Sequence, residues 1–543
     1  MKKDFIKDKR WVWMVLFAVF FTISSCTGEK KRVINFPATD LSSENMIPKP
    51  LKIIPTNTAF GLDQYTAIYS SQTESGFNAV AEFLSEKIKG KTGLNLAVNE
   101  SDAGTVDRVI YINKTDSTEL DGAEAYQLYI TNDSVILNAS TAEGAFRGIQ
   151  TLRQIIPEVS NDTLSEHPIW PIPSGKITDN PNFEYRGSML DVARHFFSVA
   201  DVKKYIDLLA YYKINVLHLH LSDDQGWRIE IKSWPRLTEI GGSTEVGGEA
   251  GGFFTQEDYK EIVAYAAMHY MTIVPEIDMP GHTNAASVSY PILNGNGKTP
   301  KLYEGTHVGF STFDTRKDTV YAFIDDVVRE ISEITPGPYF HIGGDESHVT
   351  RKNDYIYFVE RVEKIVQKYS KRMIGWDEVA QGNLHASSVA HFWNSEENAN
   401  SAISKGMHLI LSPAKKTYLD MQYDTLSKFG LHWAAYIPVD TAYIWTPENY
   451  AKGIPKDRIL GVEAPLWSET ISNMDELEYL AFPRIIGYSE LSWSTEENRN
   501  WDNFKVRLAN QAPFMDRMDV KYYPSHRIDW KESKYTYKEI PKD

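Results

Sequence analysis

The stretch Tyr339-Phe-His-Ile-Gly-Gly-Asp-Glu346 is a short apolar run that ends in two glycines and two carboxylates. Seven other short runs end in a similar polar or aromatic cluster, and helical stretches separate most of them: 187–191, 215–221, 272–276, 372–376, 388–393, 408–411 and 460–463. Together with 339–343, they predict eight strands, most of them followed by a helix. That order predicts an α/β fold of the (β/α)8 TIM-barrel type over residues 180–510, with function at the face where the strands end.

A small α+β domain is predicted before the barrel, over residues 51–173. Strands are expected at 109–113, 125–130 and 134–138, and helices at 77–89 and 142–156. Pro168, Pro171 and Pro173 predict a linker to the barrel. No cluster of His, Cys or carboxylate residues in this region calls for a chemical explanation, so we expect a noncatalytic domain. Residues 511–543 are expected to form a C-terminal extension that packs on the barrel.

The N-terminus has the pattern of an export signal. Basic residues precede an apolar run at 11–23, which is too short to span a bilayer comfortably as a permanent helix. Cys26 follows this run and is the only cysteine of the chain, and its context resembles the lipobox of bacterial lipoproteins. We therefore predict a signal peptide at 1–25, lipidation of Cys26, a tether at 26–50 and an exported, membrane-anchored lipoprotein. The alternative is an unmodified cysteine near a plain cleavage site.

Composition and charge narrow the class of partner. The chain has 543 residues, 42% of them apolar, which is enough for a large core and for two or three domains. It carries 57 Lys and Arg against 73 Asp and Glu, a formal charge of −16, which argues against nucleic acid as the main partner. A neutral substrate fits better. The 13 Trp and 30 Tyr suit a carbohydrate site, since the C–H face of a sugar packs on aromatic rings, but core packing explains them as well.

Metal chemistry is one of two chemistries to weigh at the predicted strand ends. His218 and His220 lie two residues apart on one strand and so point to the same side, as in metal-dependent barrel hydrolases. The fifth predicted strand supplies no histidine and the eighth no aspartate, so the ligand set stays incomplete. We therefore expect both imidazoles to be buried and hydrogen-bonded inside the barrel, and we predict no metal and no cofactor.

Glycoside cleavage is the other chemistry, and Asp345 and Glu346 favour it. The reaction needs an acid that protonates the leaving oxygen and a group that stabilises the positive charge developing at the anomeric carbon. The two preceding glycines let the backbone turn tightly past the strand end, and adjacent side chains emerge on different sides. The two carboxylates can therefore have different roles.

Six segments, in this order, resemble family 20 glycoside hydrolases, the β-N-acetylhexosaminidases: Arg186-Gly-Ser-Met-Leu-Asp191, Leu217-His-Leu-His-Leu-Ser-Asp-Asp-Gln-Gly-Trp-Arg228, Pro280-Gly-His282, His341-Ile-Gly-Gly-Asp-Glu346, Gly375-Trp-Asp-Glu378 and Leu466-Trp-Ser-Glu469. The resemblance covers the barrel from about residue 181 to 505. Residues 51–173 resemble the small noncatalytic domain that precedes the barrel in that family.

The resemblance implies a substrate-assisted mechanism. The 2-acetamido carbonyl oxygen of the sugar attacks its own anomeric carbon, and water opens the resulting oxazolinium-type intermediate with retention. Glu346 matches the general acid and base of this reaction. Asp345 matches the carboxylate that accepts a hydrogen bond from the acetamido N–H, orients the internal nucleophile and offsets the positive charge of the intermediate.

Other site residues follow from the resemblance one at a time. Arg186 matches an arginine that donates to the 3- and 4-hydroxyls of the sugar, and Glu469 matches a carboxylate that accepts from the 4- and 6-hydroxyls. Tyr418 matches a tyrosine that binds the acetamido oxygen, with Asp420 as its neighbouring carboxylate. Three indoles match the walls of the acetamido pocket: Trp376, Trp393 and Trp467. His282 matches a histidine that pairs with an aspartate and tunes the general acid. This aspartate is either Asp223 or Asp224, and the sequence leaves the choice open; both aspartates are also expected among the residues that bind the substrate.

The expected function is exo-acting hydrolysis, with release of terminal N-acetylglucosamine from a glycan, and with N-acetylgalactosamine as a second candidate. A site that holds the 3-, 4- and 6-hydroxyls leaves little space for a further sugar on that side. Two alternatives stay open from the sequence: a glycan-binding lipoprotein on an inactive barrel, and a retaining glycosidase that uses two carboxylates and no acetamide.

Overall fold

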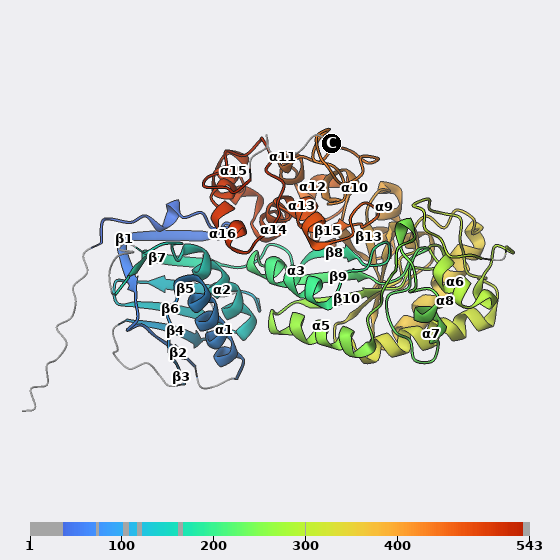
Figure 1. The fold of residues 1–543 in the computed structure, drawn as a ribbon, viewed down its shortest axis with the longest axis horizontal. Coiled ribbons are helices and arrows are strands. Elements are labelled where there is room, and N and C mark those ends of the chain that lie inside the picture. The colour runs from blue at the N-terminus through green and yellow to red at the C-terminus, as the bar shows by residue number, and fades with distance from the viewer. Residues whose placement is uncertain are drawn as a thin grey trace, which may run out of the picture.

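The computed structural model describes residues 36–71, 75–100, 108–116, 122–160, 167–298 and 300–535, and Figure 1 shows them as two domains side by side. Cys26 and the predicted signal peptide lie outside the described residues. Within these ranges, no helix has both the length and the apolar character needed to cross a membrane.

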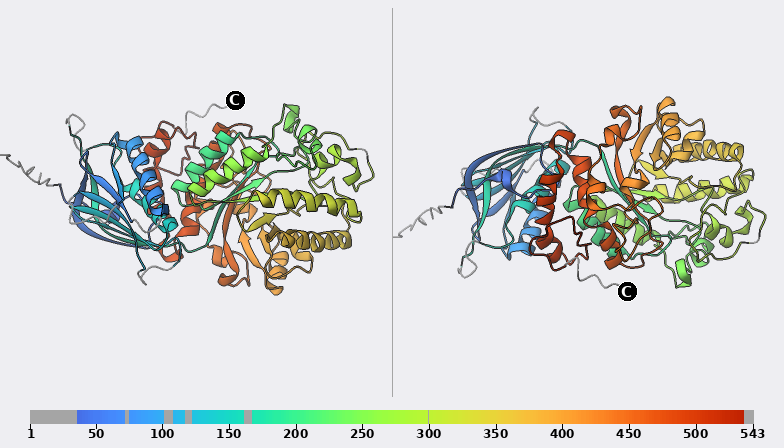
Figure 2. Two further views of the ribbon diagram at one scale, coloured as in Figure 1. Left: turned by 90° about the horizontal axis from the view of Figure 1, so that it is seen from below. Right: turned by 90° about the horizontal axis from the view of Figure 1, so that it is seen from above.

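The first domain is a seven-stranded mixed sheet with strand order β1-β7-β5-β6-β4-β2-β3. Its strands are β1 (Lys52–Leu62), β2 (Ala67–Ser70), β3 (Val98–Glu100), β4 (Val109–Lys114), β5 (Tyr126–Ile130), β6 (Ser134–Ala139) and β7 (Trp170–Asp179). The helices α1 (Ser75–Thr92) and α2 (Ala142–Ile155) lie between this sheet and the second domain (Figures 1 and 2). The three predicted strands and both predicted helices are present, and β1, β2, β3 and β7 are additional.

The predicted proline linker is wrong, because Pro171 and Pro173 lie in strand β7. This strand pairs with the edge strand β1 over Trp170–Pro173 and Gly175–Thr178, with a bulge between the two stretches, whereas β5 pairs only with Gly175–Asp179. The two prolines therefore sit where β7 has a neighbour on one side only. Proline has no N–H to donate to a second neighbour, so this position accommodates it.

The predicted tether is too long, because the chain already folds before residue 50. Leu41 lies in a short 3-10 helix, Leu41–Ser43, and is fully buried, as is Ile47. The backbone N–H of Ile47 donates to the Gln154 side chain at 2.7 Å, and that of Lys49 donates to Glu490 at 2.9 Å. These apolar side chains and backbone bonds attach residues 41–50 to both domains.

The second domain is a closed, parallel barrel of eight strands in the order β10-β11-β12-β13-β14-β15-β8-β9. The strands are β8 (Tyr185–Asp191), β9 (Val216–His220), β10 (Thr272–Glu276), β11 (Tyr339–His341), β12 (Arg372–Trp376), β13 (Val389–Phe392), β14 (His408–Leu411) and β15 (Ile459–Leu466). All eight lie within a few residues of the predicted runs, so the predicted TIM barrel is confirmed.

Helices cover the outside of the barrel and continue into the C-terminal region (Figure 1). They are α3 (Val199–Tyr211), α4 (Arg236–Glu239), α5 (Gln256–Met268), α6 (Asn284–Ser289), α7 (Asp318–Glu333), α8 (Lys352–Lys368), α9 (Glu396–Ser404), α10 (Ala414–Thr417), α11 (Val439–Tyr443), α12 (Pro447–Tyr450), α13 (Met474–Ala481), α14 (Arg484–Trp493), α15 (Trp501–Ala509) and α16 (Ala512–Arg517). Phe514 of α16 stacks on Tyr211 of α3, with ring centroids 3.7 Å apart, and Arg517 pairs with Glu158 of the first domain. The C-terminal segment therefore contacts both domains.

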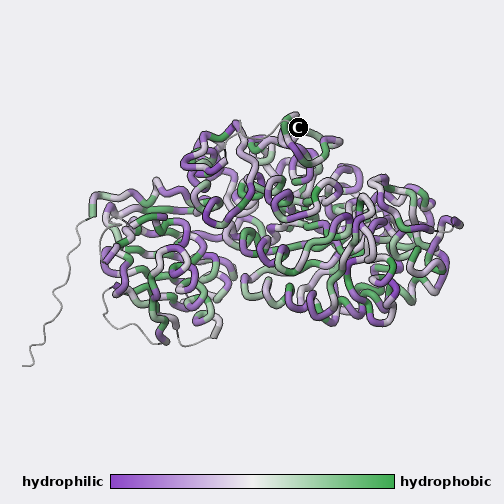
Figure 3. The backbone as a smooth tube through the Cα atoms, in the orientation of Figure 1, coloured by the Kyte–Doolittle hydropathy of each residue, from purple (hydrophilic) through white to green (hydrophobic). Residues whose placement is uncertain are grey.

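The interior of the barrel is apolar at one end and polar at the other. Hydrophobic stretches run through both domains (Figure 3). A separate apolar layer lies toward the amino end of the barrel and comes from the first or middle part of seven of its strands: Tyr185, Val216, Val274, Ile374, Val389, Ile410 and Leu460. The first domain contacts this closed end, where Arg186 of β8 meets Glu124. Any site inside the barrel must therefore open at the carboxyl ends of the strands.

Candidate active site

A cavity of about 220 Å³ lies at the carboxyl ends of the strands. Its lining residues are Arg194, Thr306, Val308, Asp345, Glu346, Trp393, Tyr418, Asp420, Leu431, Trp433, Trp467 and Glu469. Seven of them were predicted, and they come from the loops after β11, β13, β14 and β15. A larger groove of about 1200 Å³ lies near the amino end, between the two domains. Catalytic residues of (β/α)8 barrels sit at the opposite end, so the smaller cavity is the candidate site.

Two glycines shape the turn that carries the carboxylate pair. Gly343 and Gly344 follow β11 with φ angles of +63° and +98°, which side chains with a Cβ rarely adopt. A Cβ on Gly343 would lie 2.0 Å from Oδ1 of Asp278, so glycine is required there. The turn buries Asp345 to 8% exposure and leaves Glu346 partly exposed at the cavity.

His282 lies directly behind both carboxylates. Its Nε2 is 3.7 Å from Oδ2 of Asp345 and 3.7 Å from Oε2 of Glu346. Its Nδ1 is 3.0 Å from Oδ1 of Asp223, which answers the question that the sequence left open. Asp224 instead accepts hydrogen bonds from the backbone N–H of Asn284 and the hydroxyl of Ser311. Neither Asp223 nor Asp224 lines the cavity, so the expectation that they bind the sugar directly is wrong.

Burial and neighbouring charges set the protonation of this group. Burial lowers the pKa of His282, but Asp223 and Asp345 outweigh it and raise that pKa well above its usual range, so the imidazole is a cation. Burial, reinforced by the charge of Asp278, raises the pKa of Asp345 well above its usual range. A ligand that brings an N–H donor or a positive charge to Asp345 would favour its ionised form.

Three buried carboxylate oxygens in the cavity have no hydrogen-bond partner among the described residues: Oδ1 of Asp345, Oδ1 of Asp420 and Oε2 of Glu469. A buried acceptor without a donor costs about 1–3 kcal/mol. All three belong to residues that were predicted in the site, and Asp345 and Glu469 were predicted to accept hydrogen bonds from the sugar. The cavity is therefore built for a ligand that carries several N–H or O–H donors.

Aromatic rings form the remaining walls. Trp393 stacks nearly parallel to Tyr418, with ring centroids 6.5 Å apart, and Trp433 meets both rings edge-on. Trp433 is 59% exposed and lies in a long loop, where no strand-end pattern in the sequence could have identified it. Such rings suit the apolar face of a sugar.

Trp376 does not line the cavity, in contrast to the expectation. Its ring is 1% exposed, stacks on His391 with centroids 4.3 Å apart and lies 5.7 Å from Trp467. The indole N–H donates to Oε1 of Glu276 at 3.0 Å. Trp376 therefore lies one layer below the cavity and supports the ring of Trp467 above it.

The expected role of Arg186 in sugar binding is wrong. Arg186 is the second residue of β8, at the closed amino end, and it is fully buried. Its guanidinium pairs with Glu124 of the first domain and lies 4.9 Å from the ring centroid of Trp493. Burial would raise the pKa of Glu124, but Arg186 and Arg147 lower it to about 2, so the contact is an ion pair. Arg186 joins the two domains.

Arg194 is the arginine that reaches the cavity. It follows the carboxyl end of β8, and its guanidinium lies 2.9 Å from Oδ2 of Asp223 and 3.3 Å from Oδ2 of Asp191. Functional residues of a barrel lie just past the strand ends, and this rule applied to the run 187–191 would have selected Arg194.

The two arginines should respond differently to substitution. Arg186→Ala leaves Glu124 with one partner fewer, and we expect the free energy of unfolding to fall by about 3–5 kcal/mol, as for a broken buried ion pair. Arg194→Ala should instead lower kcat/KM by roughly 10- to 150-fold, equivalent to a charged hydrogen bond of about 1.5–3 kcal/mol. Urea unfolding and steady-state kinetics on both variants would measure this, and a folded Arg186→Ala protein with a raised KM would contradict the assignment.

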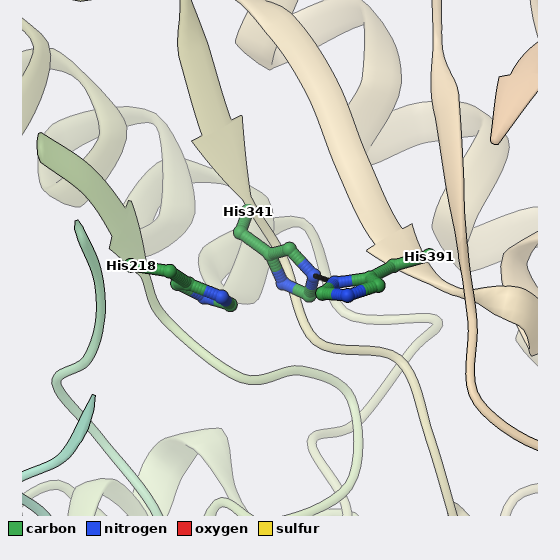
Figure 4. A group of neighbouring side chains, drawn as sticks. All are labelled: His218, His341 and His391. Carbon is green, nitrogen blue, oxygen red and sulfur yellow. Dashed lines mark hydrogen bonds between the residues drawn. The ribbon is translucent and has the colours of Figure 1, made fainter. Parts of the chain in front are cut away.

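The polar half of the barrel holds three converging imidazoles, His218, His341 and His391 (Figure 4). Every nitrogen already faces a protein partner. His218 lies between Glu463 at 2.9 Å and Glu276 at 3.0 Å. Nε2 of His341 contacts Nδ1 of His391 at 3.3 Å, Nδ1 of His341 accepts from the backbone N–H of Gly343, and Nε2 of His391 contacts the Ser412 hydroxyl at 2.6 Å. These contacts make a hydrogen-bond network, as expected for His218.

Comparison with known proteins identifies the family of both domains. Residues 183–496 match the model of the glycosyl hydrolase family 20 catalytic domain, and residues 43–180 match that of domain 2 of the same family. A β-N-acetylhexosaminidase of Cellulomonas fimi is 38% identical over 412 residues, which cover 75% of this chain and 82% of that protein.

Two solved structures from Streptomyces plicatus are also similar. The N-acetyl-β-hexosaminidase in complex with Thio-NAglucal is 43% identical, with a TM-score of 0.86, over 91% of this chain and 99% of that one. A mutant β-hexosaminidase in complex with its product GlcNAc is 43% identical, with a TM-score of 0.85, over the same shares. Both predicted domains are thus matched, and the chain belongs to glycoside hydrolase family 20.

Proposed function

We propose that this chain is a membrane-anchored enzyme that trims glycans outside the cytoplasm, one terminal N-acetylglucosamine at a time. As a member of family 20 it is an exo-acting β-N-acetylhexosaminidase, and the mechanism of the family is substrate-assisted. The assignment of the substrate to this chain rests on one observation, the three unpartnered carboxylate oxygens in a cavity of about 220 Å³.

Each orphaned oxygen suits one donor of the sugar. Asp345 lies beside Glu346 and the imidazolium of His282, so its free oxygen suits the acetamido N–H at the reacting end. Asp420 and Glu469 lie on the loops after β14 and β15, where they suit ring hydroxyls. Arg194 supplies the complementary donors. A sugar with a 2-acetamido group satisfies this set, and a plain hexose leaves Asp345 without its N–H donor.

The reaction then follows in two balanced steps. The acetamido carbonyl oxygen forms a bond to the anomeric carbon while the bond to the leaving oxygen breaks, and Glu346 gives that oxygen its proton. Asp345, drawn to its ionised form, accepts from the acetamido N–H and offsets the positive charge of the oxazolinium. Water then attacks the anomeric carbon, Glu346 takes up its proton, and the acetamide is restored with net retention.

The size of the cavity supports exo action. Pockets for drug-sized ligands usually measure about 300–1,000 Å³, so a cavity of about 220 Å³ suits a single sugar ring. If Asp420 and Glu469 bind ring hydroxyls as proposed, their carboxylates occupy the region that a further sugar on the non-reducing side would need.

The domain arrangement supports the anchor. The first domain covers the amino end of the barrel, and the cavity opens at the other end. The apolar run at 11–23 and Cys26 precede the first domain in the chain. A lipid on Cys26 would therefore attach the protein by the side away from the cavity and leave the cavity accessible to glycans.

One experiment tests both parts of the proposal. The full chain and its Cys26→Ala variant are expressed in a bacterium, and hydrolysis of p-nitrophenyl β-N-acetylglucosaminide and β-glucoside is measured in membrane and soluble fractions. We expect cleavage of the first substrate only, with the activity in the membrane fraction for the full chain and in the soluble fraction for the variant. Cleavage of the glucoside would favour an enzymic nucleophile, and equal fractionation of both proteins would refute the anchor.

A further inference from the structure

The catalytic pair is connected to the interior of the barrel by one continuous chain of polar contacts. Nε2 of His282 is 3.7 Å from both catalytic carboxylates, and its Nδ1 is 3.0 Å from Oδ1 of Asp223. Oδ2 of Asp223 is 2.9 Å from Nε2 of His220, and Nδ1 of His220 is 2.7 Å from Oε2 of Glu276. His220 and Glu276 lie at the carboxyl ends of the neighbouring strands β9 and β10 and are fully buried.

Glu276 also contacts the residues that support the cavity wall. Its Oε1 accepts the indole N–H of Trp376 at 3.0 Å and lies 3.1 Å from Nδ1 of His341. Its Oε2 is shared by His220 and His218 at 2.7 and 3.0 Å. The Glu276 carboxylate therefore contacts both Trp376, which lies under Trp467, and His220, which connects through Asp223 to His282.

The charges alternate in sign along this series of polar contacts. Burial alone would raise the pKa of Glu276, but the surrounding imidazoles hold it well below the usual range, so Glu276 is an anion. Burial opposes protonation of His220, but Glu276 and Asp223 raise its pKa well above the usual range. With a carboxylate at each ring nitrogen, His220 carries both protons and donates in both directions. Asp223 is thus held from three sides, by His220, Arg194 and His282.

We propose that Glu276 and His220 are positioning residues for the hydrolysis: through Asp223 they fix the orientation and the protonation of the His282 imidazole that faces Asp345 and Glu346. This inference rests on the proposed function. His282 has no hydrogen bond on the catalytic side, where both contacts are 3.7 Å, so among the described residues Asp223 is the only hydrogen-bond partner of its ring. Asp223 in turn contacts His220 of strand β9 directly, and Arg194 connects it to Asp191 of β8.

Other charged groups also act on this series of polar contacts. Those that face His220, Asp223, His282 or Glu276 from neighbouring elements are Asp191, Arg194, His218, Asp224, Asp278, His341, Asp345 and Glu346. Replacing Glu276 by glutamine changes none of these groups chemically, and glutamine has nearly the same shape as glutamate, so we expect them to stay in place. The difference between the variant and the parent protein then reports the loss of one carboxylate charge and of the second proton that it keeps on His220.

The test compares Glu276→Gln with Glu463→Gln in the full chain, solubilised in detergent. Glu463 is a matched control, because it is also fully buried in the barrel, contacts His218 at 2.9 Å and Tyr185 at 2.5 Å, and touches neither His220 nor Asp223. Hydrolysis of p-nitrophenyl β-N-acetylglucosaminide is measured from pH 4 to 10, together with thermal unfolding, which shows that each variant is folded.

We expect Glu276→Gln to lower kcat by about 10- to 100-fold, the range seen when a supporting hydrogen-bond partner is lost around metal sites, with KM nearly unchanged. The alkaline limb of its kcat/KM profile, where His282 loses its proton, should move to higher pH. Without Glu276, His220 loses its second proton and becomes neutral. Asp223 then has one cationic partner fewer, so its negative charge holds the proton of His282 more strongly. Glu463→Gln should lose stability but keep the limb of the parent.

A double variant gives a second, independent criterion. If His220 acts only as the link between Glu276 and Asp223, Glu276→Gln should cost no further activity in a His220→Gln background, because residues of one network are not additive. Additive losses, an unmoved alkaline limb, or equal limb shifts in Glu276→Gln and Glu463→Gln would each overturn the proposal. An inactive parent protein would instead overturn the proposed function, and this inference with it.

Discussion

Glu346→Gln is expected to lower kcat/KM on an unactivated glycan by about 10²- to 10⁴-fold, the usual contribution of a general acid. Glutamine keeps the shape of the side chain but has no proton to give to the leaving oxygen. A leaving group that departs without a proton, such as p-nitrophenolate, needs this help less. The loss should therefore be small for p-nitrophenyl β-N-acetylglucosaminide and large for the β-linked disaccharide of N-acetylglucosamine.

Leaving-group dependence is the measurement that separates this role from a structural one. Steady-state kinetics on a series of aryl β-N-acetylglucosaminides should show a steeper dependence on the acidity of the leaving phenol for Glu346→Gln than for the parent. Binding of the product, followed by calorimetry, should change little, since Glu346 lies at the rim of the cavity and is partly exposed. A uniform loss across the series would show that Glu346 is not the proton donor.

Asp345→Asn is expected to lower kcat/KM by about 10²- to 10³-fold, the cost of removing one charge-stabilising group from a reacting centre. Asparagine cannot offset the charge of the oxazolinium, and its amide can turn an N–H toward the acetamido N–H. The loss should be largest in kcat, because the carboxylate charge acts most strongly on the charged intermediate. A variant in which KM rises while kcat stays unchanged would show that Asp345 only binds the sugar.

The same substitution should make the folded protein more stable at neutral pH. Burial and Asp278 raise the pKa of Asp345 in the folded state, so between the unfolded pKa and the raised pKa the folded protein binds more protons than the unfolded chain. Stability then falls as pH rises through that window, and asparagine removes this cost. Thermal unfolding at several pH values should show the gain growing from acid to neutral pH, and a destabilised variant at neutral pH would contradict the assignment.

Local sequence patterns predicted most of the barrel. Each strand is a short apolar run bounded by a polar cluster, and this pattern depends on neighbours within a few residues. The strand β7 was missed for the same reason. Prolines at 171 and 173 usually end regular structure, and only the absence of a second partner strand at that point makes them acceptable.

The sequence by itself predicted the barrel, the location of the site at the carboxyl ends of its strands, and Asp345 and Glu346 as neighbours in that site, because each of these features depends on residues that are close together in the chain. Only the tertiary structure decided that Asp223 pairs with His282, that Arg194 and not Arg186 reaches the cavity, and that Trp376 lies beneath it. Each of these depends on contacts between residues on different strands, whose distances arise only when the barrel closes. In the sequence, an arginine that faces the cavity cannot be told from an arginine that joins two domains. The burial of Arg186 against Glu124 is what distinguishes it from Arg194.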